Sequence, residues 1–519
     1  MTPVVGAAAL GVPETFNAAA HFVDRHIGEG RGAKVAIECG DERVTYRELV
    51  ERVNRVGSAL RRSLDVRREE RIALLLLDGP AFFYSFFGAI KIGAVPIPLN
   101  TLWKPADYEY VLNDSRARVL VVSPELHPQI EKIPRDRLPL LEHVVVHVDE
   151  LLGSGDAELE AAPTSRDEAA FWLYSSGSTG RPKGCVHLQH DMVICAELFA
   201  KGVIGMREDD RAFSVAKLFF AYGLGNAGYF PLAAGATSIL WPDAPTPQNV
   251  YRVIERHRPT LVFSVPTSYG MLLAHGRPEG RDFDLSSIRL AVSAGEALPP
   301  ALYERFKARF GVDILDGIGS TEALHMFISN RPDAIRPGSS GLIVRGYDAR
   351  VLDDNGAAVP AGEIGNLWVA GDSMCACYWN QHEKTKATIE GGWLRTGDKY
   401  SQDADGYYWY AGRSDDMLKV GGLWVSPIEV ENALVQHAAV QECGVVGRED
   451  RDTLMKPAAF VVLKAGIAGT PELASELQQF VRERLAEYKR PRWVEFLPEL
   501  PKTATGKIQR FRLRELTRL

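Results

Sequence analysis

A run of small and hydroxylated residues, Tyr174-Ser-Ser-Gly-Ser-Thr-Gly-Arg-Pro-Lys-Gly184, most constrains what this chain can fold into. It follows an apolar stretch, 170–174, that is typical of a strand. Glycines let the backbone turn tightly, so that successive N–H groups can converge on an anion. Arg181 and Lys183 add positive charge, and hydroxyl donors come from Ser175, Ser176, Ser178 and Thr179. The segment therefore predicts a loop that binds phosphate groups.

The loop is not a Walker phosphate loop, because Lys183 is followed by Gly184 rather than by serine or threonine. Its composition alone fits a flexible polar surface loop equally well. The full string, however, resembles the signature loop of the adenylate-forming superfamily, which contains acyl- and aryl-CoA ligases, firefly luciferases and the adenylation domains of peptide synthetases. The resemblance implies a catalytic role for Lys183 and ATP binding by Ser175, Ser176, Gly177, Ser178, Thr179, Gly180 and Lys183.

Charge and cysteine usage narrow the functional class. The 519 residues carry a formal net charge of −7, which gives no general attraction for nucleic acid or for anionic membranes. The six cysteines are scattered, which indicates free thiols in a reducing compartment. The N-terminus lacks the basic flank of a signal peptide, and the apolar stretch 81–99 is interrupted by a lysine and two prolines. We therefore expect a soluble, cytoplasmic protein.

Strand-like and helix-like apolar patterns alternate along most of the chain. Thr45-Tyr-Arg-Glu48 has the form of a capping box, and apolar residues then recur at helical spacing up to Leu60. Arg71–Leu77 is a continuous apolar run, as expected for a strand buried on both faces. This order predicts an α/β fold with parallel sheets. Further strands are expected at 94–99, 118–123, 143–148, 261–265, 289–293 and 313–315, and further helices at 81–92, 249–257 and 298–310.

The pattern changes towards the C-terminus. Residues 337–410 form short strand-like runs broken by Gly, Asp and Asn, which predicts an antiparallel β subdomain. After a polar turn come strand-like runs at 440–446, 458–463 and 493–496 and a helical run at 471–488. We place a domain boundary at Asp415, between a large N-terminal domain over 1–414 and a small α+β domain over 415–519.

Two further strings match nucleotide motifs of the same superfamily. Asp316-Gly-Ile-Gly-Ser-Thr-Glu322 reads by itself as a strand-to-helix turn, and Trp393-Leu-Arg-Thr-Gly-Asp398 as an ordinary turn. The resemblance implies that Thr321 contacts the α-phosphate and that Glu322, a catalytic residue, holds Mg²⁺. It also implies that Asp398 and Arg413 bind the ribose, that adenine packs around Gly295, Glu296, Ala297, Asp316, Gly317 and Ile318, and that Gly319 belongs to the ATP site.

The C-terminal string Pro501-Lys-Thr-Ala-Thr-Gly-Lys-Ile-Gln-Arg510 reads either as a basic surface turn or as the superfamily's last motif, in which Lys507 is the catalytic, ATP-contacting lysine. A cation there would offset the repulsion between an attacking carboxylate and an anionic phosphate. The resemblance implies that the small domain is mobile, with its hinge at Asp415. Lys419, Gly421 and Gly422 would then line the CoA side.

An aromatic-rich segment, Ala216-Lys-Leu-Phe-Phe-Ala-Tyr-Gly-Leu-Gly-Asn226, points to the acid. Aromatics are usually plain core, but a flat acid needs aromatic walls. This segment, 293–299 and 319–327 are similar to benzoate-CoA ligases, although Met326 and Ala323 depart from that pattern. His325 is either a satisfied pocket histidine or a partner for a ring hydroxyl. The resemblance implies a pocket formed by Phe220, Ala221, Tyr222, Ala294, Gly295, Gly319, His325 and Met326.

These observations predict an aryl-CoA ligase that converts benzoate or a substituted benzoate, ATP and CoA to aryl-CoA, AMP and pyrophosphate, with Mg²⁺ as cofactor. The alternatives are a hydroxybenzoate-CoA ligase, another acyl-CoA ligase, a carrier-loading adenylation enzyme and a nucleotide-binding protein without catalysis. The expected partners are small molecules, with neither nucleic acid nor membrane among them. The sequence leaves open the ring substituent, the residues for the CoA nucleotide, and the oligomeric state, with a homodimer as one option.

Overall fold

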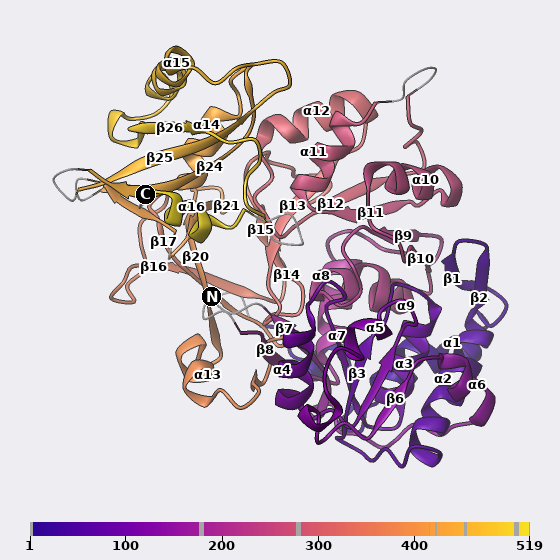
Figure 1. The fold of residues 1–519 in the computed structure, drawn as a ribbon. Coiled ribbons are helices and arrows are strands. Elements are labelled where there is room, and N and C mark those ends of the chain that lie inside the picture. The colour runs from indigo at the N-terminus through magenta and orange to yellow at the C-terminus, as the bar shows by residue number, and fades with distance from the viewer. Residues whose placement is uncertain are drawn as a thin grey trace.

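The computed structural model describes residues 4–175, 181–276, 282–414, 416–420, 423–450, 454–502 and 508–517. The chain runs from an N-terminal α/β region, through a second α/β region and a β-rich region, to a lobe formed by its C-terminal residues (Figure 1). No helix within these described residues has both the length and the apolar character required to cross a bilayer.

The first sheet has four parallel strands in the order β4-β3-β5-β6. Its central strand is β3 (Arg71–Leu75), in which residues 72–75 are fully buried, as a strand covered on both faces requires. Helices α2 (Tyr46–Arg62) and α3 (Pro80–Lys91) pack against each other beside it. The expected capping box is confirmed, because Thr45 and Glu48 bond each other's backbone N–H groups at the start of α2. The other elements of this region are β4 (Val95–Pro98), α4 (Pro105–Ser115), β5 (Val119–Val122), α5 (His127–Ile130), β6 (His143–Val145) and α6 (Val148–Ser154).

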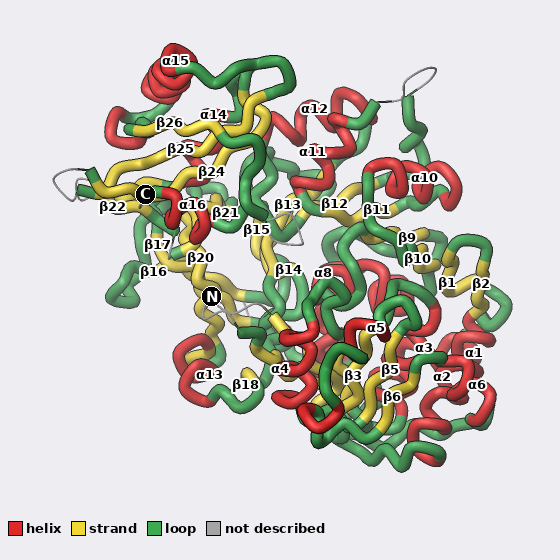
Figure 2. The backbone as a smooth tube through the Cα atoms, in the orientation of Figure 1, coloured by secondary structure: helices red, strands yellow, loops and turns green. Residues whose placement is uncertain are grey.

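The second sheet has nine strands in the order β15-β14-β13-β12-β11-β9-β10-β1-β2. Its centre is parallel, and the pairs β1–β2, β13–β14 and β14–β15 are antiparallel. Helices α10, α11 and α12 lie beside β11–β13 and share a hydrophobic core with them (Figure 2). The bounds are β1 (Val35–Cys39), β2 (Glu42–Thr45), β9 (Arg211–Ser214), β10 (Thr237–Leu240), α10 (Pro247–His257), β11 (Leu261–Ser264), α11 (Pro266–Ala274), β12 (Leu290–Ser293), α12 (Pro300–Phe310), β13 (Ile314–Gly319), β14 (Met326–Ser329) and β15 (Leu342–Ile343).

Antiparallel strands complete the large region. A three-stranded sheet, β18-β8-β7, carries the ends of the phosphate loop, and a five-stranded sheet joins β16, β17, β19, β20 and β21. The expectation of an antiparallel β subdomain within 337–410 is therefore confirmed. The bounds are β7 (Ala169–Ser175), β8 (Lys183–Leu188), α7 (Asp191–Cys195), α8 (Ala221–Gly223), α9 (Phe230–Ala234), β16 (Asp348–Leu352), β17 (Gly365–Ala370), β18 (Cys377–Tyr378), α13 (His382–Thr388), β19 (Ile389–Glu390), β20 (Trp393–Gln402) and β21 (Tyr408–Arg413).

The C-terminal lobe is an α+β unit with a core of its own. A mixed sheet, β24-β25-β26, packs against α14 and α15, and a two-stranded ladder joins β22 and β23. The bounds are β22 (Leu418–Val420), β23 (Leu423–Val425), α14 (Pro427–Leu434), β24 (Val440–Glu449), β25 (Met455–Leu463), α15 (Pro471–Arg482), β26 (Trp493–Phe496) and α16 (Arg510–Leu516).

Several elements differ from the expected bounds, among them the three that follow. The strand expected over 143–148 ends at Val145, because Val148 begins α6, whose first turn carries two acidic residues. The helix expected over 471–488 ends at Arg482, and Arg490, which precedes a proline, is extended. The motif 316–322 does not lead into a helix, because β13 continues to Gly319 and turns directly into β14.

Candidate active site

The β7–β8 hairpin holds both ends of the phosphate loop. Ser175 and Lys183 are Cα partners in the last pair of this ladder, so residues 176–182 connect two paired strands. The expected lead-in strand 170–174 is confirmed as part of β7. Lys183 is the first residue of β8, and its side chain is only 12% exposed.

Lys183 points to a carboxylate from a distant part of the chain. Its Nζ lies 2.8 Å from Oε1 of Glu322, which sits in the turn between β13 and β14. Burial favours the neutral form of Glu322, but the Lys183 ammonium outweighs this and holds the pKa of the carboxyl below its usual value. The site therefore keeps an anionic oxygen group beside a cation, at the place where the loop's phosphate groups are expected.

Tyr378 completes this cluster and was missed by the sequence reasoning. Its hydroxyl lies 2.7 Å from Lys183 Nζ and 2.7 Å from Glu322 Oε1, and the Lys183 ammonium stands 4.0 Å from the centre of the tyrosine ring. Only the pairing of β18 with β8, which sets Tyr378 opposite Cys185, brings it here.

A buried histidine contacts the main chain of the second nucleotide motif, residues 316–322. His187, on β8, has Nδ1 2.8 Å from Oδ2 of Asp191 and Nε2 2.8 Å from the carbonyl oxygen of Thr321. Both side chains are fully buried. The sequence reasoning missed this pair too, although the spacing of four residues between a histidine and an aspartate was visible in the sequence.

The segments expected around adenine lie at the ends of two neighbouring parallel strands. Gly295, Glu296 and Ala297 follow β12, and Asp316, Gly317 and Ile318 belong to β13. The Leu298 N–H donates to Asp316 Oδ2 at 3.3 Å, which ties the two segments together. Burial raises the pKa of Asp316 to about 8, so this carboxyl is neutral at pH 7.

Asp398 and Arg413, the residues expected at the ribose, face each other across β20 and β21. They are Cα partners, and Arg413 Nη1 lies 3.1 Å from Asp398 Oδ1. Gly397 has a φ of +76°, a conformation that favours glycine, and it lies where the pairing of β20 with β17 is irregular.

His325 lies among aromatic rings, of which Tyr222 was expected in the acid pocket and Phe230 and Phe199 were not. Its ring is 5.5 Å from that of Tyr222, 4.5 Å from that of Phe230 and 5.0 Å from that of Phe199. Burial lowers the pKa of His325 to about 3, so the imidazole is neutral. Its Nε2 lies 3.0 Å from Asn226 Oδ1, while Nδ1 is buried with no hydrogen-bond partner among the described residues.

Glycine 225 makes room for this imidazole. A Cβ at Gly225 would lie 2.5 Å from Cδ2 of His325, a distance that real contacts essentially never show. The remaining expected pocket residues lie on the elements around it: Phe220 caps the start of α8, Ala221 and Tyr222 belong to α8, Ala294 and Gly295 follow β12, Gly319 ends β13 and Met326 begins β14. Gly225 and Asn226 were inside the recognised aromatic segment, but were not assigned to the pocket.

Several expected site residues fall outside the described residues: Ser176, Gly177, Ser178, Thr179, Gly180, Asp415, Gly421, Gly422 and Lys507. Lys419 lies in β22, with only its backbone described. The roles expected for them, and the domain boundary at Asp415, stay predictions.

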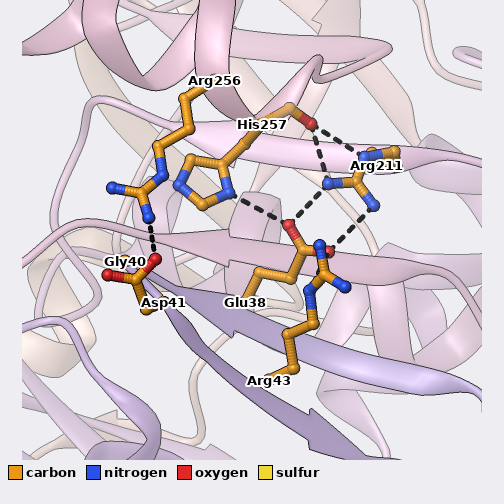
Figure 3. A pocket seen from close by; sticks show the side chains of 7 residues that line it. All are labelled: Glu38, Gly40, Asp41, Arg43, Arg211, Arg256 and His257. Atoms are coloured by element: carbon orange, nitrogen blue, oxygen red, sulfur yellow. Dashed lines mark hydrogen bonds and ion pairs between the residues drawn. The ribbon is translucent and has the colours of Figure 1, made fainter.

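A pocket of about 300 Å³ elsewhere in the molecule is lined by charged side chains, which pair with one another (Figure 3). Arg211 binds both oxygens of Glu38, at 3.2 and 2.6 Å, and His257 Nδ1 lies 3.0 Å from the same carboxylate. Arg256 pairs with Asp41 at the rim. These contacts join β1, β9 and α10, at the other end of the nine-stranded sheet from β13 and β14. We interpret them as structural.

Comparison with known proteins gives full-length matches. A family model described as AMP-binding enzyme matches residues 24–379, and one described as AMP-binding enzyme C-terminal domain matches 429–507. The chain is 51% identical to a benzoate–CoA ligase of Thauera aromatica, over 98% of this chain and 97% of that protein. It is 46% identical to a 4-hydroxybenzoate–CoA/benzoate–CoA ligase of Rhodopseudomonas palustris, over 97% and 94%. A crystal structure of an anthranilate CoA ligase in complex with anthranoyl-AMP matches with a TM-score of 0.93 and 47% identity, over 99% of both chains.

Proposed function

Because this chain belongs to the AMP-binding enzyme family, we propose that it is an ATP-dependent aryl-CoA ligase acting on benzoate or a ring-substituted benzoate. In the first step the aryl carboxylate attacks the α-phosphorus of ATP, and pyrophosphate leaves with formation of an aryl-adenylate. In the second step the thiol of CoA attacks the acyl carbon, and AMP leaves with formation of the aryl-CoA thioester.

The observation that carries this proposal is the Lys183–Glu322 pair beside the buried, aromatic surroundings of His325. The pair supplies opposite charges of the kind that a triphosphate and its counter-ion need. The aromatic rings supply flat apolar walls for the acid. The turn from β13 to β14 joins the two, because Glu322 and His325 are three residues apart.

Glu322 fits the expected Mg²⁺ by the chemistry of its donor atoms. No group of three or more His, Cys, Asp or Glu side chains in the described part of the chain could hold a metal by itself. Mg²⁺ in nucleotide sites, however, takes only one or two carboxylates, because phosphate oxygens and waters supply the rest. Once bound there with ATP, Mg²⁺ would neutralise phosphate charge.

The chain's own groups would act mainly by placement and charge. The Lys183 ammonium offsets the negative charge that the carboxylate and the α-phosphate bring together. The Thr321 main chain is fixed by His187, and Asp398 can accept two hydrogen bonds from a ribose diol. Lys507, from the proposed mobile domain over 415–519, would add its ammonium for adenylate formation. That domain would then rotate at Asp415 and bring Lys419, Gly421 and Gly422 to the CoA side.

The decisive experiment follows AMP in mixtures of protein, ATP, Mg²⁺ and benzoate, with and without CoA. We expect AMP release that requires both the acid and CoA. AMP formation that needs a carrier protein and ignores CoA would indicate a carrier-loading enzyme. If the protein bound ATP but formed no AMP with any aromatic acid offered, it would be a nucleotide-binding protein without catalysis.

A hydroxy- or aminobenzoate is the second candidate substrate, and the unpartnered Nδ1 of His325 favours it. A neutral imidazole nitrogen accepts a hydrogen bond, which a ring hydroxyl or amino group can donate. Initial rates for benzoate and for its hydroxy-, amino- and fluoro-derivatives would rank the acids. We also propose that the enzyme works in the cytoplasm, in keeping with its six cysteines, none of which forms a disulfide bond in the described residues.

A further inference from the structure

We propose that Tyr378 is a positioning residue of the nucleotide site, which holds one carboxylate oxygen of Glu322 so that the other is presented to the metal–nucleotide complex. This inference rests on the proposed function and adds to it a residue outside the strings that were matched in the sequence. It predicts that the Tyr378 hydroxyl acts on the Mg²⁺-dependent part of ATP binding through Glu322.

The geometry divides the two oxygens of Glu322. Lys183 Nζ at 2.8 Å and the Tyr378 hydroxyl at 2.7 Å both contact Oε1. Both of these side chains contact Oε1, and no side chain among the described residues hydrogen-bonds Oε2. A carboxylate that is anchored through one oxygen keeps a fixed direction for the other, and a fixed hard oxygen is the protein ligand that Mg²⁺ prefers.

Of the two groups that contact Oε1, the tyrosine can keep its hydrogen bond when ATP binds. The Lys183 ammonium has three N–H donors on a flexible chain, and phosphate oxygens compete for them when ATP binds. The Tyr378 hydroxyl donates to Oε1 from a buried ring that packing holds in place. When Lys183 turns towards the phosphates, the hydroxyl still satisfies Oε1. A buried carboxylate oxygen is therefore never left without a partner, a situation that costs free energy.

The segment that carries Tyr378 is itself fixed to Glu322. The tyrosine is only 2% exposed, its strand β18 pairs with β8, and its backbone N–H donates to Thr385 Oγ1 at 3.0 Å. Three residues earlier, the Cys375 N–H donates to the main-chain carbonyl oxygen of Glu322 at 2.7 Å. The same short segment thus braces both the backbone and the side chain of Glu322.

Tyr378→Phe tests the proposal, because it removes the hydroxyl and keeps the buried ring. We expect isothermal titration calorimetry to show about tenfold weaker binding of ATP in Mg²⁺, as for the loss of one hydrogen bond to a charged group. Binding of ATP in EDTA should change much less. Tyr251→Phe is the matched control, since it also removes a buried hydroxyl with a 2.7 Å bond, to the Leu272 carbonyl, in the separate core around α10. It should leave both affinities unchanged.

A double-mutant cycle keeps the proposal falsifiable even if Tyr378→Phe loses stability. In a Glu322→Gln background, adding Tyr378→Phe should have no further effect on the affinity for ATP in Mg²⁺. Additive losses, equal losses with and without Mg²⁺, or an unchanged affinity in Tyr378→Phe would overturn the proposal. Tight Mg²⁺-dependent ATP binding by the wild-type protein, without AMP formation from any acid, would contradict the proposed function and leave this inference standing.

Discussion

His187 Nε2 lies 2.8 Å from the carbonyl oxygen of Thr321, although 134 residues separate them in the chain. The strand that leaves the phosphate loop thereby holds the main chain of the second nucleotide motif. The other ring nitrogen, Nδ1, lies 2.8 Å from Oδ2 of Asp191, which also accepts the Leu188 N–H at 3.0 Å. His187 and Asp191 form a buried hydrogen-bonded pair that aligns two parts of the site.

Asp191→Asn should lower the free energy of unfolding by about 2 kcal/mol, because it weakens the buried hydrogen bonds that Asp191 Oδ2 makes with His187 Nδ1 and the Leu188 N–H. Urea unfolding followed by fluorescence measures this. The matched control is Asp209→Asn, which breaks an exposed pair with Arg207 and should cost less than about 1 kcal/mol. Similar costs for the two variants would show that the buried hydrogen bonds of Asp191 contribute nothing special to stability.

Lys507→Ala should lower the rate of adenylate formation by a factor of about 100 or more. Exchange of labelled pyrophosphate into ATP measures this rate. Thioester formation from supplied benzoyl-adenylate and CoA should be spared, because no charge then has to be brought onto a triphosphate. Equal loss of both half-reactions would refute the role that we propose for Lys507.

Because of Asp316, the free energy of unfolding should fall as pH rises. Its folded-state pKa of about 8 lies above its ordinary value of 3.8, so between these values the folded protein holds a proton that the unfolded chain has released. The folded state therefore loses stability from about pH 4 through about pH 8, by up to about 1.4 kcal/mol per pH unit. Asp316→Asn should flatten this slope when unfolding is compared at pH 5, 6.5 and 8. An unchanged slope would mean that Asp316 is ionised in the folded protein.

His325→Phe should change the order of kcat/KM among the acids while keeping an aromatic ring in the pocket. Phenylalanine keeps an aromatic ring among Tyr222, Phe230 and Phe199 but has no Nδ1 acceptor. We expect kcat/KM for hydroxy- and aminobenzoates to fall by about tenfold relative to benzoate, the effect of one lost hydrogen bond. His325→Ala, which also removes the ring, should impair all the acids. The same ranking in wild type and His325→Phe would remove Nδ1 from substrate recognition.

Local patterns were enough to predict the α/β architecture. The capping box at Thr45 and the apolar run from Arg71 report on their own neighbourhoods, and both elements formed as expected. Element ends were less certain: α15 ends at Arg482, before the expected end at 488, and neither proline nor glycine marks that point in the sequence. The motif at Asp316 also misled in part. Its strand runs on because Gly319 lies against the His325 backbone, where a Cβ would come within 2.4 Å of the carbonyl oxygen.

The family strings identified Lys183 and Glu322, but not the residues that hold them. Tyr378 reaches Glu322 only through the pairing of β18 with β8, and His187 reaches Thr321 only because β8 passes behind the turn after β13. Such contacts depend on strand register across more than a hundred residues, and no local pattern records it. Sequence reasoning therefore found the groups expected to touch substrate more readily than those that support them.

The absence of a side chain at position 225 has a consequence for engineering the range of acids. Any residue other than glycine there would push the imidazole of His325 out of its place, so the two positions cannot be varied independently. A library that randomises position 225 against the native histidine would return mostly inactive clones. Randomising 225 together with a smaller residue at 325 would open new shapes of cavity, and new substrates should come from such paired changes.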